Sequence, residues 1–503
     1  MPDHGGHNLR ARRLGLHAQH DAIVIMRTDC HVCRSEGLSA RTQVQVIAGQ
    51  REVLATLYQV SSDLIATNEV GLSEGAWERL GVSEGDSLTI RHPDPVESLG
   101  RMRHRIYGHR LDSAAFGAIM ADIVEGHYSD VQLAAFVTAC AALPLDERET
   151  IELTRVMVDV GERLHWPTSP IVDKHSVGGL PGNRTTPIVV AIVAAHGLVM
   201  PKTSSRAITS PAGTADMMET LAPIDLDLPT IRRVVERESG CIVWGGSVRL
   251  SPADDILIRI ERALDLDTEG QLIASVLSKK IAAGSTHLVL DMPVGPTAKV
   301  RSLDSAQVLS QRLVEISAGF GLETRVLMSD GRQPVGHGIG PALEARDVLA
   351  VLQGAPRAPE DLRARACRLA GALLELGGRA SDGAGEHLAQ GTLADGRAWA
   401  KFQRICEAQG GMRTPGAANH RHPLLAIRDG KIASVDNRKL ARIAKLAGAP
   451  HAKTAGLEMH VKLDQRTQAG EPICTVHAES RGELDYALDY ATAQADFVGI
   501  VAE

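Results

Sequence analysis

Apolar and polar residues alternate along several short segments within the first hundred positions of the chain. This period of two is typical of strands that bury one face. It predicts strands over 21–26, 43–47 and 51–60, and a turn leading into a further strand over 82–90. We therefore predict a β-rich N-terminal domain over residues 1–98. The first twenty residues are rich in arginine and histidine, and we expect them to be a mobile lead-in to this domain.

From position 106 the apolar residues recur every three to four positions, which is the period of an amphipathic helix. Three such helices are predicted before position 160, and the same spacing returns over 252–284. The two segments together predict a small all-α domain made of residues 99–165 and 252–284.

The remaining chain alternates strand-like and helix-like segments, with strands over 288–291 and 324–328 and helices over 305–319, 342–353 and 362–376. Such alternation favours a large α/β domain, which we assign to residues 166–251 and 285–418. Residues 419–503 then form a small C-terminal α+β domain. A chain of 503 residues is long enough for several cores, so the predicted fold class is a multi-domain α/β protein.

Residues 171–221 hold the densest chemistry of the chain. The apolar pair Ile171 and Val172 is followed by four polar residues, a glycine-rich loop over 178–182, and an apolar helical segment over 187–195. A strand, a glycine loop and a helix in this order direct backbone N–H groups and a helix dipole at an anion. The loop is neither a Walker A motif nor a dinucleotide fingerprint, because both required glycine patterns are missing.

A second loop of small and hydroxyl residues follows over 204–214. Thr214 is predicted to cap a helix that begins one residue later. Two hydroxyl-rich loops that share a lysine, a histidine and an arginine predict an oxyanion site with chemistry attached.

The compound pattern of these loops resembles the thymidine/pyrimidine-nucleoside phosphorylase family. The pattern is K-H-S-x-G-G at 174–179, followed by S-x-R and then G-T-x-D-x-x-E within 204–219. The resemblance covers residues 100–490 and continues through 250–254 and 274–280. The chain is similar to the longer members of the family, which carry an extra N-terminal domain and include AMP phosphorylases. This resemblance implies the fold of the second structural class of nucleoside phosphorylases.

The resemblance also implies a set of site residues. A lysine and four hydroxyl side chains are expected to bind phosphate: Lys174, Ser176, Thr185, Ser204 and Thr214. Thr185 occupies a position where the family has serine. The remaining substrate contacts are expected from Gly179, Ser205, Arg206, Ala207, Ile208, Thr209, Ser210, Ser275, Lys279, Lys299 and Arg259.

The base that leaves in phosphorolysis carries negative charge, which a donor must relieve. His175 is one candidate, because a histidine has the near-neutral pKa that proton transfer needs. Asp267 is the second, because an aspartate at this spacing is the assigned donor in the AMP phosphorylase group. Arg259 or Arg262 fills the family's base-binding arginine position, and the spacing leaves both open.

These expectations define a pentosyltransferase that converts a pyrimidine nucleoside and phosphate into free base and pentose 1-phosphate. The rival within the class is a nucleoside 5′-monophosphate phosphorylase, for which Lys299 would contact the 5′-phosphate. A rival from another class is a Mg²⁺-dependent phosphoribosyltransferase, which needs an acidic metal site instead of the K-H-S pattern. We expect no metal and no cofactor, with inorganic phosphate as co-substrate.

Composition excludes several other classes of protein. A formal net charge of −7 leaves no electrostatic basis for binding a nucleic acid polymer. The sequence has neither an apolar membrane span nor a hydrophobic signal core. Seven scattered cysteines do not form a disulfide framework, and Cys30 and Cys33 lack the further ligands of a zinc site. We expect a cytoplasmic homodimer or larger homo-oligomer.

Overall fold

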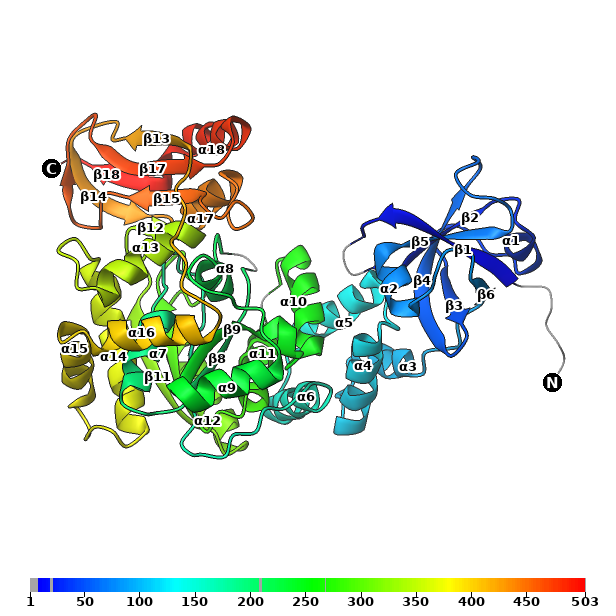
Figure 1. Ribbon diagram of the computed structural model, residues 1–503, viewed down its shortest axis with the longest axis horizontal. Coiled ribbons are helices and arrows are strands. Elements are labelled where there is room, and N and C mark those ends of the chain that lie inside the picture. The colour runs from blue at the N-terminus through cyan, green and yellow to red at the C-terminus, as the bar shows by residue number, and fades with distance from the viewer. Residues whose placement is uncertain (1–7, 19–20, 208–209, 267, 503) are drawn as a thin grey trace. The chain divides into compact units, whose positions relative to one another are not determined.

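The computed structural model describes residues 8–18, 21–207, 210–266 and 268–502, and all elements given below belong to these ranges. The chain divides into two compact units. The first comprises the residues up to Arg103 together with Ala121–Ser129, and the second comprises His104–Met120 and the residues from Asp130 onward. Figure 1 labels the elements in chain order.

The first unit is built around a closed six-stranded barrel with the strand order β1-β5-β2-β4-β3-β6 (Figure 1). Val44 and Val46 of β3 are fully buried and alternate with partly exposed glutamines, which is the predicted period of two. The bounds are β1 Asn8–Leu16, β2 Ile23–Arg27, α1 His31–Ser35, β3 Gln43–Ala48, β4 Arg51–Val60, β5 Glu69–Ser73, α2 Glu74–Leu80 and β6 Ser87–Arg91.

Strand β1 lies in the segment expected to be a mobile lead-in, and that prediction is wrong for these residues. Leu9 and Ala11 face the barrel interior and are 1% and 2% exposed. On the outside, Arg12 contacts Glu69 at 3.2 Å. Two small buried side chains give only a weak apolar pattern, so the strand depends on partners more than fifty residues away in sequence.

Six helices of the described residues lie where the sequence predicts the all-α domain, and the grouping of these helices into one domain stays a prediction. Asp146 is the N-cap of α6 and forms a capping box with buried Glu149, which also accepts hydrogen bonds from Arg105 and Arg110. The bounds are α3 Ser98–Ile106, α4 Ser113–Glu125, α5 Asp130–Ala142, α6 Glu147–Asp159, α10 Pro252–Leu264 and α11 Glu269–Ala282.

The α/β domain contains the parallel strands β11-β10-β7 and the parallel pair β8-β9. Helix α7 is buried along nearly its whole length and packs against α14 and α16. The strands are β7 Val172–Ser176, β8 Met200–Ser204, β9 Gly240–Trp244, β10 His287–Val294 and β11 Glu323–Asp330. The helices are α7 Thr186–Ala195, α8 Thr214–Glu219, α9 Leu228–Glu238, η1 Gly245–Val248, α12 Leu303–Ala318, α13 Pro341–Leu352, α14 Glu360–Leu376, α15 Gly385–Ala394 and α16 Arg397–Ala408.

The C-terminal domain has two antiparallel sheets, β12-β15-β17-β13 and β16-β14-β18, with α17 and α18 packed against each other (Figure 1, orange and red). Strand β12 comes from the α/β part of the chain and pairs with β15. The bounds are β12 Gly338–Ile339, β13 His420–Leu425, β14 Gly430–Val435, α17 Asn437–Leu446, β15 Gly456–Met459, β16 Arg466–Thr467, β17 Pro472–Ala478, α18 Arg481–Ala493, η2 Ala495–Phe497 and β18 Val498–Val501. The predicted fold class is therefore confirmed.

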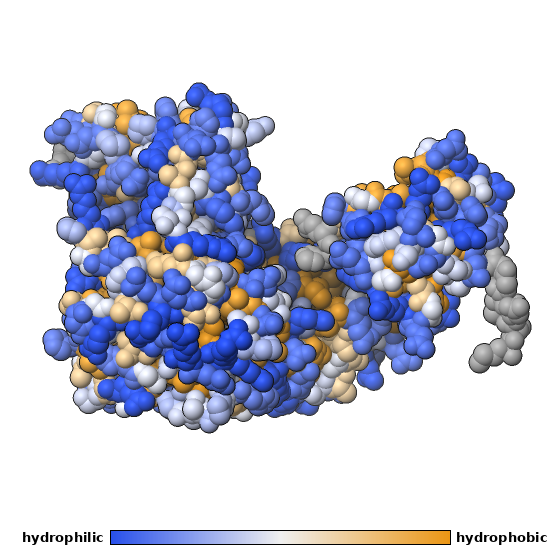
Figure 2. Space-filling model, viewed as in Figure 1, coloured by the Kyte–Doolittle hydropathy of each residue, from blue (hydrophilic) through white to orange (hydrophobic). Residues whose placement is uncertain are grey.

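The surface seen in Figure 2 is mostly hydrophilic, with apolar residues in small patches. Within the described ranges, no helix combines the length and apolar character that crossing a membrane requires.

Candidate active site

The two loops singled out in the sequence begin at neighbouring strand ends. β7 carries Lys174–Ser176 at its C-terminal end, and β8 ends at Ser204. The backbone N–H of Val172 donates to the carbonyl oxygen of Val199 at 2.9 Å in a parallel arrangement. Because parallel strands present their carboxyl ends at one edge of a sheet, both loops open at the same place.

Lys174 is buried between hydroxyl groups of the first loop. Its Nζ donates to Thr185 Oγ1 at 2.8 Å and to Thr186 Oγ1 at 3.5 Å. Burial lowers the pKa of Lys174 to about 8, with Asp291 opposing the shift and Arg184 adding to it. The ammonium is still mostly protonated at neutral pH, and a bound anion would offset its desolvation.

Arg184 belongs to this region although the sequence analysis did not single it out. Its buried guanidinium forms an ion pair with Glu344 of α13. Nη1 donates to Thr214 Oγ1 at 3.2 Å and Nη2 to the carbonyl oxygen of Ala212 at 2.8 Å. Arg184 therefore joins the first loop to the second. A charged residue just before the fully apolar run of α7 was the signal that could have found it.

The two serines of the phosphate set differ in their contacts. Ser176 Oγ donates to Asp291 Oδ2 at 3.1 Å, and Asn183 Nδ2 donates to the same oxygen at 2.7 Å. Ser204 Oγ is buried and has no hydrogen-bond partner among the described residues. Buried hydroxyl groups are nearly always paired, so Ser204 offers a donor to a ligand.

The N-terminus of the helix that follows the second loop is capped differently from the prediction. α8 begins at Thr214, and Gly213 occupies the N-cap position. Asp216 Oδ2 accepts from the backbone N–H groups of Gly213 at 2.9 Å and of Ala207 at 2.6 Å. The prediction that Thr214 caps the helix is wrong because this carboxylate satisfies the loop's N–H groups, which leaves the Thr214 hydroxyl to Arg184.

Arg206 is anchored by carboxylates of α8. Its guanidinium donates to both oxygens of Glu219 at 2.9 Å and to Asp216 at 3.3 Å, and it lies over the Trp244 ring. Glu219 also pairs with Lys453 at 2.7 Å. These contacts fix the start of the second loop, on which Ser205, Ala207 and Ser210 also lie. Ile208 and Thr209 lie outside the described residues.

Gly179 is packed against the turn that contains Lys299. Its φ is +81°, and a Cβ at this position would lie 2.4 Å from the Lys299 backbone nitrogen. Only glycine fits both conditions. The Lys299 side chain is exposed, and its contact with the 5′ end of a substrate stays a prediction.

A buried triad lies next to His175. Lys202 and Lys280 donate to the two oxygens of Asp173 at 2.9 and 2.7 Å. Burial acts to raise the pKa of Asp173, but the two lysines hold it below its usual value. Burial lowers the pKa of Lys280 to about 7, with Asp173 opposing the shift and Lys202 adding to it, so the charge of this triad changes near neutral pH.

Burial and the neighbouring lysines together set the protonation of His175. Burial is the main cause that lowers the pKa of His175 well below its ordinary value, and Lys280 and Lys202 add to it. The expectation of a near-neutral pKa is therefore wrong. The imidazole is neutral near pH 7 and can donate a hydrogen bond, but it cannot supply a positive charge.

Ser275 and Lys279 lie one turn apart on α11. Lys279 Nζ is 2.5 Å from Asp254 Oδ2 of α10. Asp255 follows, and desolvation by the surrounding protein together with the Asp254 carboxylate raises the pKa of this exposed residue to about 6. Asp255 was missed in the sequence, where the adjacent acidic pair opening α10 was the available signal.

The remaining predicted residues are not placed against the phosphate loops. Arg259 forms a two-pronged ion pair with Asp130 of α5, at 2.8 and 3.2 Å. Its alternative, Arg262, is exposed in the last turn of α10. Asp267 lies outside the described residues. The roles of all three stay predictions.

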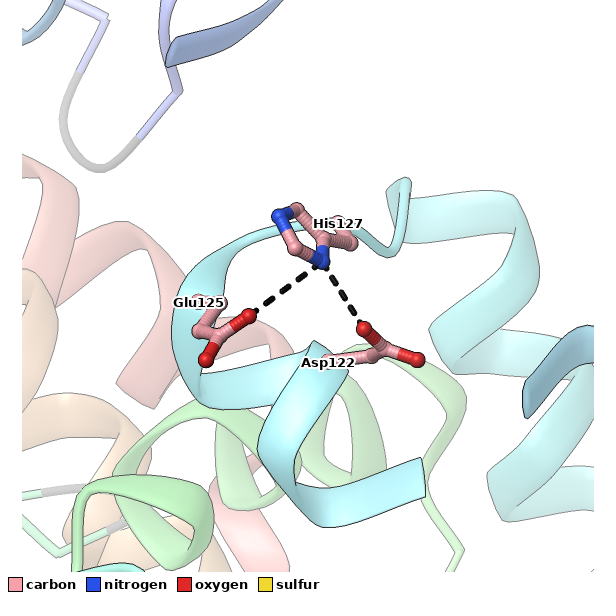
Figure 3. A group of neighbouring side chains, drawn as sticks. All are labelled: Asp122, Glu125 and His127. Atoms are coloured by element: carbon pink, nitrogen blue, oxygen red, sulfur yellow. Dashed lines mark hydrogen bonds and ion pairs between the residues drawn. The ribbon is translucent and has the colours of Figure 1, made fainter. Parts of the chain in front are cut away.

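Two clusters elsewhere resemble metal sites but have simpler explanations. Asp122, Glu125 and His127 converge at the end of α4 (Figure 3), where His127 Nδ1 is 2.8 Å from Asp122 and 3.5 Å from Glu125. This nitrogen is occupied by the carboxylates themselves. Cys30 and Cys33 are buried free thiols at helix α1.

Comparisons with known proteins define the class. Residues 168–399 match the a/b domain of a glycosyl transferase family, and residues 102–161 match the helical bundle domain of that family. Residues 431–497 match a pyrimidine nucleoside phosphorylase C-terminal domain. The chain is thus a glycosyltransferase in which these three domains follow the N-terminal barrel along the sequence.

Curated relatives narrow the class to a family. A protein of Sphingopyxis alaskensis named "Putative thymidine phosphorylase" is 65% identical over 97% of this chain and 95% of its own length. Proteins of the same name from Chelativorans sp. and Tolumonas auensis are 63% and 61% identical over 98% of this chain and 97% of their own lengths. The chain belongs to the thymidine/pyrimidine-nucleoside phosphorylase family, as the sequence predicted.

Solved structures share the fold at low identity. Anthranilate phosphoribosyltransferase from Thermus thermophilus is 19% identical with a TM-score of 0.50, over 61% of this chain and 99% of that one. The Saccharomyces cerevisiae enzyme, solved with PRPP and Mg, is 16% identical with a TM-score of 0.50, over 63% and 98%. At this identity the likeness concerns the fold alone.

Proposed function

We propose that the protein catalyses the reversible phosphorolysis of a pyrimidine nucleoside, converting thymidine and phosphate into thymine and 2-deoxyribose 1-phosphate. The observation that carries this proposal is the pair of hydroxyl-rich loops that Arg184 joins beside buried Lys174, in a chain of the pyrimidine-nucleoside phosphorylase family. The names of the relatives support thymidine as the first substrate to test.

In this mechanism the protein positions a preformed dianion and stabilises charge. Phosphate is held by the five residues Lys174, Ser176, Thr185, Ser204 and Thr214. A phosphate oxygen forms the new bond to C1′ as the bond from C1′ to the base nitrogen breaks, with inversion at C1′. The electron pair of the broken bond leaves with the base.

The negative charge on the departing base is relieved by hydrogen-bond donors. Neutral His175 is the proposed donor, and Ser275 and Lys279 are the proposed base contacts. Asp267 is the second candidate for proton donor.

Charge at the phosphate is proposed to come from Lys174 and Arg184 without a metal or cofactor. Phosphorolysis that continues undiminished in excess chelator would support this view. A requirement for Mg²⁺ and a diphosphorylated ribose would support the phosphoribosyltransferase alternative instead.

We further propose a cytoplasmic homodimer. All seven cysteines are free and buried, as suits a reducing compartment. A groove of about 640 Å³ beside α5 is lined by small apolar residues together with Ile106 and Val131, which are 49% and 76% exposed. Light scattering of the purified protein measures the assembly.

A substrate panel tests the proposal. Purified protein is incubated with phosphate and with thymidine, uridine, cytidine, AMP, CMP or UMP, and release of free base is measured. Selective release of thymine from thymidine is expected. Release of base only from monophosphates would overturn the nucleoside assignment and point to Lys299 as a 5′-phosphate contact.

A further inference from the structure

A residue of the C-terminal domain holds the turn that packs on the first phosphate loop. Asn437 begins α17 and is 1% exposed. Its Nδ2 donates to Thr297 Oγ1 at 3.0 Å and to the carbonyl oxygen of Gly331 at 2.9 Å. Its backbone N–H also donates to Thr297 Oγ1, at 3.3 Å. Asn437 of the C-terminal domain therefore fixes the turn over 295–299.

The turn over 295–299 packs tightly against the first loop. The backbone of Lys299 lies so close to Gly179 that a Cβ on the glycine would meet the lysine nitrogen at 2.4 Å. Ala298 is buried at the same contact. Closely packed interiors transmit small shifts to their neighbours, so the position of Asn437 bears on the loop that follows Lys174.

The second loop has its own contact with the C-terminal domain. Lys453 Nζ is 2.7 Å from Glu219 Oε2 and 3.9 Å from Asp216 Oδ1. These carboxylates bind Arg206, and Asp216 also accepts from the loop's backbone N–H groups. Lys453 thus neutralises the acidic groups that shape the loop between Ser204 and Thr214.

A third contact from the C-terminal domain is made by Lys462 with the segment 334–336, which packs against Gly182 of the first loop. Lys462 Nζ donates to the carbonyl oxygens of Pro334 at 3.1 Å and Gly336 at 2.6 Å. Between them, the carbonyl oxygen of Val335 faces Gly182, where a Cβ would lie 2.1 Å away.

We propose that the C-terminal domain positions both phosphate loops, with Asn437 and Lys453 as positioning residues for phosphate binding. Neither residue touches the substrate. Each acts through one intermediate, the 295–299 turn or the Glu219 carboxylate. The inference rests on the proposed phosphorolysis, because phosphate is the ligand whose binding is measured.

The test compares Asn437→Ala, Thr297→Val and Lys453→Met in the full-length protein. Thr297→Val removes Thr297 Oγ1, the oxygen that accepts the hydrogen bond from Asn437 Nδ2. Lys439→Met is the matched control, because Lys439 pairs with Asp496 at 2.6 Å within the C-terminal domain. For each variant the KM for phosphate, the KM for thymidine, kcat and the thermal unfolding midpoint are measured.

The KM for phosphate is expected to rise roughly five- to twentyfold in Asn437→Ala and Lys453→Met, the loss expected for one or two hydrogen bonds. In these two variants the KM for thymidine should be nearly unchanged. In the Lys439→Met control the KM for phosphate should be nearly unchanged as well. The double variant of Asn437→Ala and Thr297→Val should lose less than the two single changes added together, because both remove the hydrogen bond between Asn437 Nδ2 and Thr297 Oγ1.

A KM for phosphate that stays at the wild-type value in folded Thr297→Val and Lys453→Met proteins would overturn the inference, even if Asn437→Ala does not fold. Equal losses in all parameters, with Lys439→Met included, would also overturn it, because such losses indicate general destabilisation. Failure of the proposed function is distinguishable, since the wild-type protein would then release no thymine in response to phosphate.

Discussion

Around the first loop, cations outnumber the carboxylates that balance them. Arg184 pairs with Glu344, Asp291 is the carboxylate that acts on Lys174, and Lys202 and Lys280 share the single Asp173 carboxylate. Such buried cations are costly without a counter-ion. A phosphate dianion supplies the missing charge, so the residues are arranged for the bound state before substrate arrives.

The affinity for phosphate is predicted to fall as pH rises through about 8, because Lys174 loses its proton there. The protonated ammonium is the form that binds, so the KM for phosphate should increase on the alkaline side. The profile is measured from about pH 7 to about pH 9.5 at constant ionic strength. Lys174→Arg is the control, since its guanidinium stays charged throughout. A wild-type KM that does not change with pH would contradict the role of Lys174.

His175→Ala is predicted to lower kcat by roughly 100- to 1,000-fold, the usual cost of losing one donor to a developing anion. The KM for phosphate should change little, because the imidazole is neutral and is not assigned to phosphate. His175→Asn, which keeps an amide donor, should recover part of the loss. If both variants instead raised only the KM for phosphate, the donor role would be wrong.

The positions of the candidate site residues were more predictable than their protonation. Lys174, Ser176 and Ser204 lie in strands that lead into hydroxyl-rich loops, and both features are visible in the sequence. The low pKa of His175 was not predictable, because it is set first by burial and then by Lys280 and Lys202, which only the fold brings beside it. The same is true of Arg184, whose partner Glu344 is 160 residues away.

At the scale of elements, the site consists of two strand–loop–helix units joined side by side. The units were predicted because their apolar runs and glycines are local features of the chain. Their closure was predicted wrongly at one point, where Asp216 and Gly213 take the capping position assigned to Thr214. Local patterns do not show which of two polar groups wins a shared set of N–H donors.

Arg184→Met is predicted to raise the KM for phosphate by roughly ten- to a hundredfold, because charged hydrogen bonds to Thr214 and Ala212 are lost. The double variant Arg184→Met with Glu344→Gln removes the unpaired carboxylate as well. It should regain stability in thermal unfolding but keep the high KM. Recovery of the wild-type KM in the double variant would show that Arg184 serves folding alone.

At the scale of the whole molecule, the proposed base contacts and the phosphate loops lie on elements that the sequence assigns to two different domains, and this division stays a prediction. Ser275 and Lys279 lie on α11 of the helical block, whereas the loops belong to the α/β domain. Gly284 lies at the crossing point, with a φ of +76° and a Cβ position 2.5 Å from the Leu164 carbonyl oxygen. Lys280 of α11 already contacts Asp173 of β7 at 2.7 Å, and closure of the predicted domains over the substrates stays a prediction.

Crystals grown with and without thymidine and a phosphate analogue should differ in the angle between the helical block and the α/β domain. The liganded form is expected to be the more closed, with movement near residues 166–169 and Gly284. An identical angle in both crystals would count against closure.

The central claim is that the paired loops bind the phosphate that cleaves the nucleoside. Its most direct test is the rate of thymine release from thymidine as a function of phosphate concentration, in the wild-type protein and in Lys174→Ala. The wild-type rate should saturate with phosphate and yield 2-deoxyribose 1-phosphate. The variant should lose about 2–4 kcal/mol of transition-state stabilisation, measured as the fall in kcat/KM for phosphate. An unchanged phosphate dependence in Lys174→Ala, or thymine release without phosphate, would contradict the claim.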